Sequence, residues 1–146
     1  MKKWLVSGYA FAALTLSVGV SASVAQEAAG AAAVAQATQV ELVQGIEGGE
    51  LLSRIEEGDA PAILDVRTPE EFAGGHIAGA INIPVTELKA RASELGIEAS
   101  DELVVYCRTG RRAAIAEATL SELGYTNLRD LDGHIKGWQE AGHPLE

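Results

Sequence analysis

Short apolar runs alternate with stretches of helical pattern from Val40 to the end of the chain. The runs with the character of strands are residues 40–43, 62–67, 80–84, 103–106 and 127–131. Helices are predicted at residues 49–57, 85–95 and 111–123, with a short closing helix within 137–144. Another helix is predicted to start at residues 68–71, where a proline marks the first helical position. Strands that alternate with crossover helices pair in parallel, and helices cover both faces of such a sheet. The pattern therefore predicts one α/β domain over residues 40–146.

The first 39 residues do not follow this pattern. Lys2 and Lys3 precede an apolar run over residues 4–20, and small residues ending at Ala25 follow it. This is the order of regions in a secretory signal peptide, so we expect residues 1–25 to be cleaved and the protein to be periplasmic. An uncleaved membrane anchor is the alternative, although the run is at the short end for a span and no basic stop-transfer cluster follows. The alanine- and glutamine-rich residues 26–39 predict a flexible leader.

The charge of the chain limits its partners. Cleavage after Ala25 would move the formal charge from −10 to −12, because Lys2 and Lys3 are lost and no acid is. An acidic protein repels nucleic acid and anionic membranes, so we expect neither as a partner of the cleaved chain. Against this background a local cluster of arginines would draw a small anion. The sequence carries no mark of a particular oligomeric state.

Cys107 lies where the apolar run 103–106 ends and a helix begins. The loop and first helical turn that follow it are Arg108, Thr109, Gly110, Arg111 and Arg112. Amides at a helix N-terminus and nearby cations favour the thiolate, which is the nucleophilic form of cysteine. A buried structural cysteine is the alternative, since free cysteine is often buried. Cys107 is the only cysteine, so an exported chain leaves it without a disulfide partner, and three arginines beside it favour a reactive thiol.

Three other polar residues are candidates for supporting roles. Asp65 and Arg67 end the apolar run 62–67, where a carboxylate usually accepts backbone or guanidinium hydrogen bonds. His76 follows a glycine at a tight turn, and we interpret it as a hydrogen-bonded structural residue rather than a general base. The histidines and the cysteine have no metal-ligand spacing, and no glycine-rich phosphate loop with its lysine is present. We therefore predict neither a metal nor a cofactor.

Four segments in order carry a resemblance to a known family: residues 64–72, 75–84, 105–112 and 131–144. From about Val40 onward the chain resembles a single-domain rhodanese, a thiosulfate sulfurtransferase of the exported type. The resemblance implies a rhodanese-like fold with a five-stranded parallel sheet and helices on both faces. It also implies a double displacement, in which the Cys107 thiolate takes the outer sulfur of thiosulfate, releases sulfite and passes the sulfur to cyanide or a thiol.

The same resemblance assigns roles to the loop. It implies that the backbone amides of residues 108–112 surround the persulfide, and that Arg108 and Arg112 bind the anionic donor or the departing sulfite. One residue departs from the family pattern, because His134 follows Gly133 where the family has a second glycine. We expect this residue to reshape a turn at the mouth of the site, or its ring to touch the substrate, and so to affect the choice of acceptor.

Two alternative functions fit the same loop. A cysteine phosphatase or arsenate reductase also uses a thiolate beside an arginine, but it has one residue more between them than the four that separate Cys107 from Arg112. A non-enzymatic persulfide carrier would need the same residues as the enzyme. Turnover of thiosulfate by the protein alone separates the carrier from the enzyme.

Overall fold

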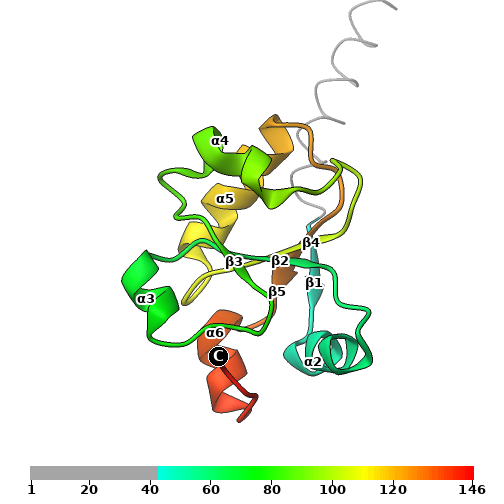
Figure 1. Cartoon of the computed structure of the whole chain (residues 1–146), viewed down its shortest axis with the longest axis vertical. Coiled ribbons are helices and arrows are strands. Elements are labelled where there is room, and N and C mark those ends of the chain that lie inside the picture. The colour runs from blue at the N-terminus through cyan, green and yellow to red at the C-terminus, as the bar shows by residue number, and fades with distance from the viewer. Residues whose placement is uncertain (1–42) are drawn as a thin grey trace, which may run out of the picture. The chain divides into compact units, whose positions relative to one another are not determined.

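A computed structural model describes residues 43–146 of the chain (Figure 1). The strands are β1 (Gln44–Ile46), β2 (Ala62–Asp65), β3 (Ile81–Asn82), β4 (Leu103–Tyr106) and β5 (Leu128–Leu131). The helices are α2 (Gly48–Glu57), α3 (Pro69–Ala73), α4 (Leu88–Arg91), the 3-10 helix η2 (Ala92–Leu95), α5 (Arg111–Glu122) and α6 (His134–Glu140). The predicted signal peptide (1–25), the predicted leader (26–39) and residues 40–42 of the first predicted strand lie outside the described residues.

The strands form one parallel sheet in the order β1-β5-β4-β2-β3. Alternate residues of β4 enter two different cores, because successive side chains of a strand point to opposite faces. Leu103 and Val105 pack with residues of α4, η2 and α5, whereas Val104 and Tyr106 pack with residues of α2 and α6. Figure 1 shows α4 and α5 on one side of the strands and α2 and α6 on the other. The predicted parallel sheet with helices on both faces is confirmed. Within residues 43–146 no helix has the length and apolar character needed to cross a membrane.

Several predicted boundaries differ from the observed ones. The described first strand covers Gln44–Ile46, beyond the predicted residues 40–43, because pairing with β5 and not apolar character selects it. Gly45 permits that pairing, since a Cβ there would lie 2.5 Å from an Asp132 carboxylate oxygen. The predicted helix 85–95 is two short pieces, α4 and η2. The closing helix begins at His134, before the predicted Gly137, because Gly133 takes a left-handed conformation (φ +72) and starts it.

The predicted helix start at residues 68–71 has the expected cap. The Thr68 hydroxyl accepts from the Glu71 N–H at 3.3 Å, and the Glu71 carboxylate accepts from the Thr68 N–H at 3.2 Å. This capping box, with Pro69 at the first helical position, begins α3 directly beyond β2. The consequence for the site is that Glu71 is held at the carboxyl edge of the sheet.

Candidate functional site

Cys107 follows β4, which lies between β5 and β2 in the sheet. Its side chain is 1% exposed, and its Sγ accepts a hydrogen bond from the Gly110 N–H at 3.0 Å. Gly110 has φ +108, a conformation open to glycine, and it is the N-cap of α5. Of the loop amides predicted to surround the sulfur, that of Gly110 is the one that donates to it. The sulfur therefore lies just beneath its own loop, at the N-terminus of a helix, where a negative charge is stabilised.

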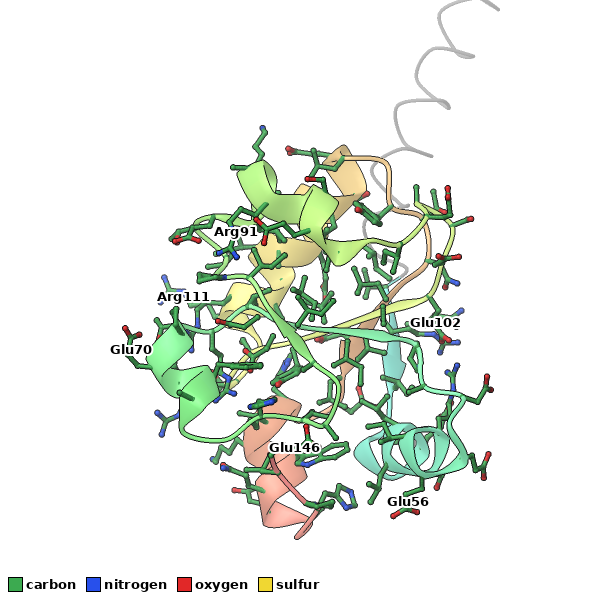
Figure 2. The ribbon with its side chains drawn as sticks, viewed as in Figure 1. Glu56, Glu70, Arg91, Glu102, Arg111 and Glu146 are labelled. Carbon is green, nitrogen blue, oxygen red and sulfur yellow. The ribbon has the colours of Figure 1, made fainter. Side chains whose placement is uncertain are left out.

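The loop arginines have different surroundings. Arg111 is exposed and lies at the surface (Figure 2). Arg112 donates to both carboxylate oxygens of Glu71, at 2.6 and 3.0 Å. The hydrogen bonds to Glu71, and more weakly the charge of Cys107, raise the pKa of Arg112. Arg112 is therefore neutralised by Glu71, which leaves Arg108 as the loop cation beside the pocket that is available to an anionic ligand.

The Glu71–Arg112 pair makes stability depend on pH in the acid range. Hydrogen bonding to Arg112 lowers the pKa of Glu71 from 4.5 to about 2. The pair's contribution is therefore complete above pH 4.5 and is lost as the pH falls toward 2. We expect the wild type to lose up to about 2 kcal/mol more unfolding free energy than Glu71→Gln between pH 6 and pH 3, measured by urea denaturation. Equal losses in the two proteins would contradict this, and Glu94→Gln, on an exposed pair, is the control.

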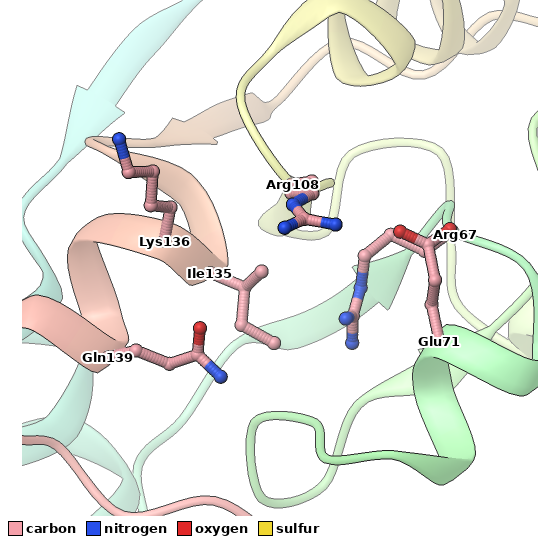
Figure 3. Close-up of a pocket in the computed structure, with 6 residues that line it drawn as sticks. All are labelled: Arg67, Glu71, Arg108, Ile135, Lys136 and Gln139. Atoms are coloured by element: carbon pink, nitrogen blue, oxygen red, sulfur yellow. The ribbon is translucent and has the colours of Figure 1, made fainter.

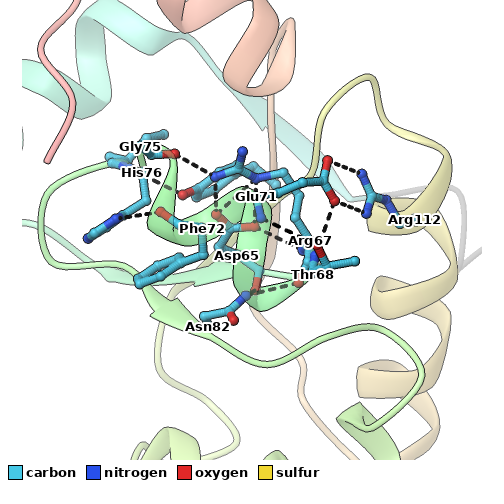
Figure 4. A network of polar contacts seen from close by, with 11 residues as sticks. Asp65, Arg67, Thr68, Glu71, Phe72, Gly75, His76, Asn82 and Arg112 are labelled. Carbon is cyan, nitrogen blue, oxygen red and sulfur yellow. Dashed lines mark hydrogen bonds and ion pairs between the residues drawn. The ribbon is translucent and has the colours of Figure 1, made fainter.

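Asp65 and Arg67 form a buried ion pair at the end of β2 (Figure 4). The Arg67 guanidinium donates to both Asp65 oxygens at 2.6 to 3.0 Å, and its Nη2 also donates to the Gly75 carbonyl oxygen at 2.8 Å. The Asn82 side chain donates to the carbonyl oxygens of both residues at 3.0 Å. Burial alone would lower the pKa of Arg67, but the hydrogen bonds and charge of Asp65 raise it overall. The pair and Asn82 together fix the backbone at the carboxyl end of β2, next to the strand that leads into Cys107.

His76 makes contacts away from the sulfur. Its Nδ1 lies 3.1 Å from the Phe72 carbonyl oxygen, and its ring stacks on Phe72 with centroids 3.7 Å apart (Figure 4). Its backbone exchanges two hydrogen bonds of 2.9 Å with Glu146. These contacts join α3 to Glu146, and the structural role of His76 stays a prediction.

A pocket of about 290 Å³ opens beside the Cys107 loop (Figure 3). Its lining residues are Arg67, Glu71, Arg108, Ile135, Lys136 and Gln139. Two lining residues are joined directly to the cysteine: Arg108 follows Cys107 in the chain, and the Ile135 N–H donates to the Cys107 carbonyl oxygen at 3.1 Å. In Figure 3, Arg108 extends into the space between α6 and α3, whereas the Lys136 side chain points away from the other lining residues.

The charges of the pocket suit an anion. Asp65 neutralises Arg67, Glu71 is shared with Arg112, and Lys136 lies 3.7 Å from a carboxylate oxygen of Glu140. Arg108 has no ion-pair partner among residues 43–146, so it gives the pocket its net positive charge. Sequence reasoning identified Arg108 but missed Lys136 and Gln139 of α6. The available signal was their position directly after β5, because the carboxyl ends of parallel strands meet at one edge of the sheet.

Comparison with known proteins agrees with this geometry. The family model described as the rhodanese-like domain matches residues 47–141. The chain is 41% identical over 70 residues to the thiosulfate sulfurtransferase PspE of Escherichia coli K12, covering 48% of this chain and 67% of that protein. It is 34% identical over 104 residues to a sulfurtransferase of Allochromatium vinosum, covering 71% and 95%. The crystal structure of a rhodanese-related protein from Thermoplasma volcanium superposes with a TM-score of 0.61 at 36% identity, covering 70% and 97%. The chain belongs to the rhodanese-like domain family.

Proposed function

We propose that the protein is a sulfurtransferase that carries sulfur as a persulfide on Cys107, with thiosulfate as donor and cyanide or a thiol as acceptor. The observation that carries the proposal is the hydrogen bond from the Gly110 N–H to Cys107 Sγ, next to a cationic pocket. The relatives named thiosulfate sulfurtransferase and sulfurtransferase support the same activity.

The reaction has two displacements. The Cys107 thiolate attacks the outer sulfur of thiosulfate, a new S–S bond forms, and the S–S bond of thiosulfate breaks. Sulfite leaves with the electron pair, and the enzyme holds a persulfide. The acceptor then attacks the outer sulfur of that persulfide, and the electron pair of the broken bond restores the Cys107 thiolate.

The pocket residues have roles in both steps. Arg108 attracts the dianionic donor and stabilises the sulfite that leaves, as a fixed cation does for developing negative charge. The Gly110 N–H stabilises negative charge on the cysteine sulfur at the start and at the end of the cycle. No step requires a metal or a cofactor.

The phosphatase alternative is less well supported by this site. Both guanidinium donors of Arg112 that face α3 are taken by Glu71, whereas a phosphatase needs an arginine free to grip the phosphate oxygens. The carrier alternative uses the same residues as the enzyme and differs only in turnover.

A second part of the proposal is export to the periplasm. Its support is the order of Lys2 and Lys3, the apolar run 4–20 and the small residues before Gln26. Fractionation of expressing cells tests it: a mature chain that begins at Gln26 in the periplasmic fraction is expected, and a full-length chain in the membrane fraction would contradict it.

The sulfurtransferase proposal is tested by mass spectrometry and by turnover. After incubation with thiosulfate, the intact protein should gain the mass of one sulfur atom, located on the peptide that contains Cys107. With cyanide added, thiocyanate should accumulate over many turnovers. Absence of the added sulfur would overturn the proposal. A persulfide that forms without turnover to cyanide or to small thiols would identify a carrier instead.

A further inference from the structure

The turn that joins β5 to α6 lies directly against the loop that holds Cys107. The Ile135 N–H donates to the Cys107 carbonyl oxygen at 3.1 Å. From the same turn the His134 ring packs on Gly110, since a Cβ at residue 110 would lie only 2.6 Å from His134 Nε2. Gly110 is the residue whose N–H donates to Cys107 Sγ. One turn therefore contacts both the carbonyl group of the cysteine and the amide that binds its sulfur.

His134 occupies this position in an unfavourable backbone conformation. Its φ of +53 lies in the left-handed region, and within residues 43–146 it is the one residue other than glycine with a positive φ. Its side chain is nonetheless buried, at 7% exposure for the residue. Glycine would adopt the same conformation without steric cost. A bulky ring kept at a strained, buried position beside a reactive sulfur points to a function of the ring itself.

Two carboxyl groups lie behind the ring. Asp130 Oδ1 lies 3.6 Å from His134 Nδ1, and neither atom has a hydrogen-bond partner in the part of the chain that the structure describes. Burial and then the charge of Asp130 raise the pKa of Glu117, on α5, to about 8. Burial also raises the pKa of Asp130. His134 and Glu117 act to lower that pKa, and the charge of Asp132 raises it further. The raised pKa favours the protonated form of Glu117, and Asp130 is the carboxyl group nearest the ring.

We propose that His134 is a positioning residue of the site: its buried ring packs on Gly110 and keeps the Gly110 N–H on Cys107 Sγ. Gly110 has no side chain of its own to anchor it, so without the ring the loop gains freedom and the N–H donates to the sulfur less of the time. This inference deepens the proposed function, because the same N–H serves the sulfur in both displacements. It concerns the thiolate itself, however, and can be tested without any sulfur donor.

The first test is the rate of Cys107 alkylation by iodoacetamide between pH 5 and pH 9 in the full chain and in His134→Gly. We expect the midpoint of the pH–rate profile to move up by about one pH unit in the variant, so that alkylation near neutral pH is up to about tenfold slower. A change in access to the sulfur would alter the plateau at high pH and leave the midpoint in place. His143→Ala, which removes another imidazole of the C-terminal region, is the matched control with an unchanged midpoint. An unchanged midpoint in His134→Gly would overturn the proposal.

Asp130→Asn is the second test and keeps the ring in the chain. Replacing the carboxyl group by an amide can only make the surroundings of the sulfur less negative, which by itself would favour the thiolate and move the midpoint to lower pH. A ring that shifts once its neighbour changes, and so releases Gly110, would move the midpoint to higher pH, so the sign separates the two effects. A midpoint at higher pH supports the positioning role, and a lower or unchanged midpoint overturns it. This test remains decisive even if His134→Gly does not fold. Neither result depends on persulfide formation, because iodoacetamide reacts with the Cys107 thiolate whether or not thiosulfate is a donor.

Discussion

Cys107→Ser should abolish sulfur transfer while the protein stays folded. A serine hydroxyl is not ionised at neutral pH and cannot form a persulfide, so both displacements are lost together. We expect thiocyanate formation from thiosulfate and cyanide to fall by a factor of at least about 10³, the size typical of losing a covalent nucleophile. The measurement is steady-state turnover, together with the intact mass after incubation with thiosulfate, which should show no added sulfur.

The control for this variant is the thermal unfolding midpoint. Cys107 is buried in the cluster that contains Val105 and Ala113, so a small polar replacement should lower the midpoint by a few degrees without unfolding the protein at room temperature. Turnover above about a tenth of the wild-type value in a folded Cys107→Ser protein would show that another group carries the sulfur. Arg111→Ala, on the exposed side of the same helical turn, should keep its activity close to that of the wild type.

Asp65→Asn should cost about 3 to 5 kcal/mol of unfolding free energy. The carboxylate is fully buried and accepts three hydrogen bonds from the Arg67 guanidinium and one from the Arg67 N–H. An asparagine of similar shape would leave that guanidinium buried without its counter-charge, which is far more costly than loss of a surface pair. Equilibrium urea denaturation at neutral pH is the measurement.

Two further variants help to explain the loss of stability expected for Asp65→Asn. Asp65→Asn combined with Arg67→Met removes the unpaired charge as well, and it should recover part of the loss. Arg91→Ala breaks an ion pair with Glu87 and Glu94 on exposed side chains and should have little effect. A loss below about 1 kcal/mol in Asp65→Asn would mean that water reaches the guanidinium and replaces the carboxylate.

The sheet and its helices were predictable because their signals are local. The apolar residues of β2 and β4 and the capping residues of α3 act within a few positions of one another. β1 and β3 were harder to predict, since three-residue and two-residue strands are defined by their partners in the sheet. Gly45 illustrates this, because only the approach of Asp132 explains a glycine there.

In the candidate site, too, the local features were predictable and the long-range contacts were not. Cys107 and its loop are contiguous, so the sequence places them together at the N-terminus of a helix. The pairing of Glu71 with Arg112 joins residues 41 positions apart, and it depends on β2 and β4 being neighbours in the sheet. The contact of His134 with Gly110 likewise requires β5 to lie beside β4. The periodicity of single segments does not give strand order, so these contacts were beyond the sequence.

The depth of Cys107 has a consequence for the lifetime of its thiol. With 1% of its surface exposed, the resting sulfur is sheltered from bulky oxidants and from disulfide exchange with other proteins, which need a thiolate at the surface. In the proposed mechanism, the persulfide would place the reactive sulfur about 2 Å beyond Sγ, the length of one S–S bond. The empty protein would then keep its thiol sheltered, and the added outer sulfur would be the atom that the acceptor attacks.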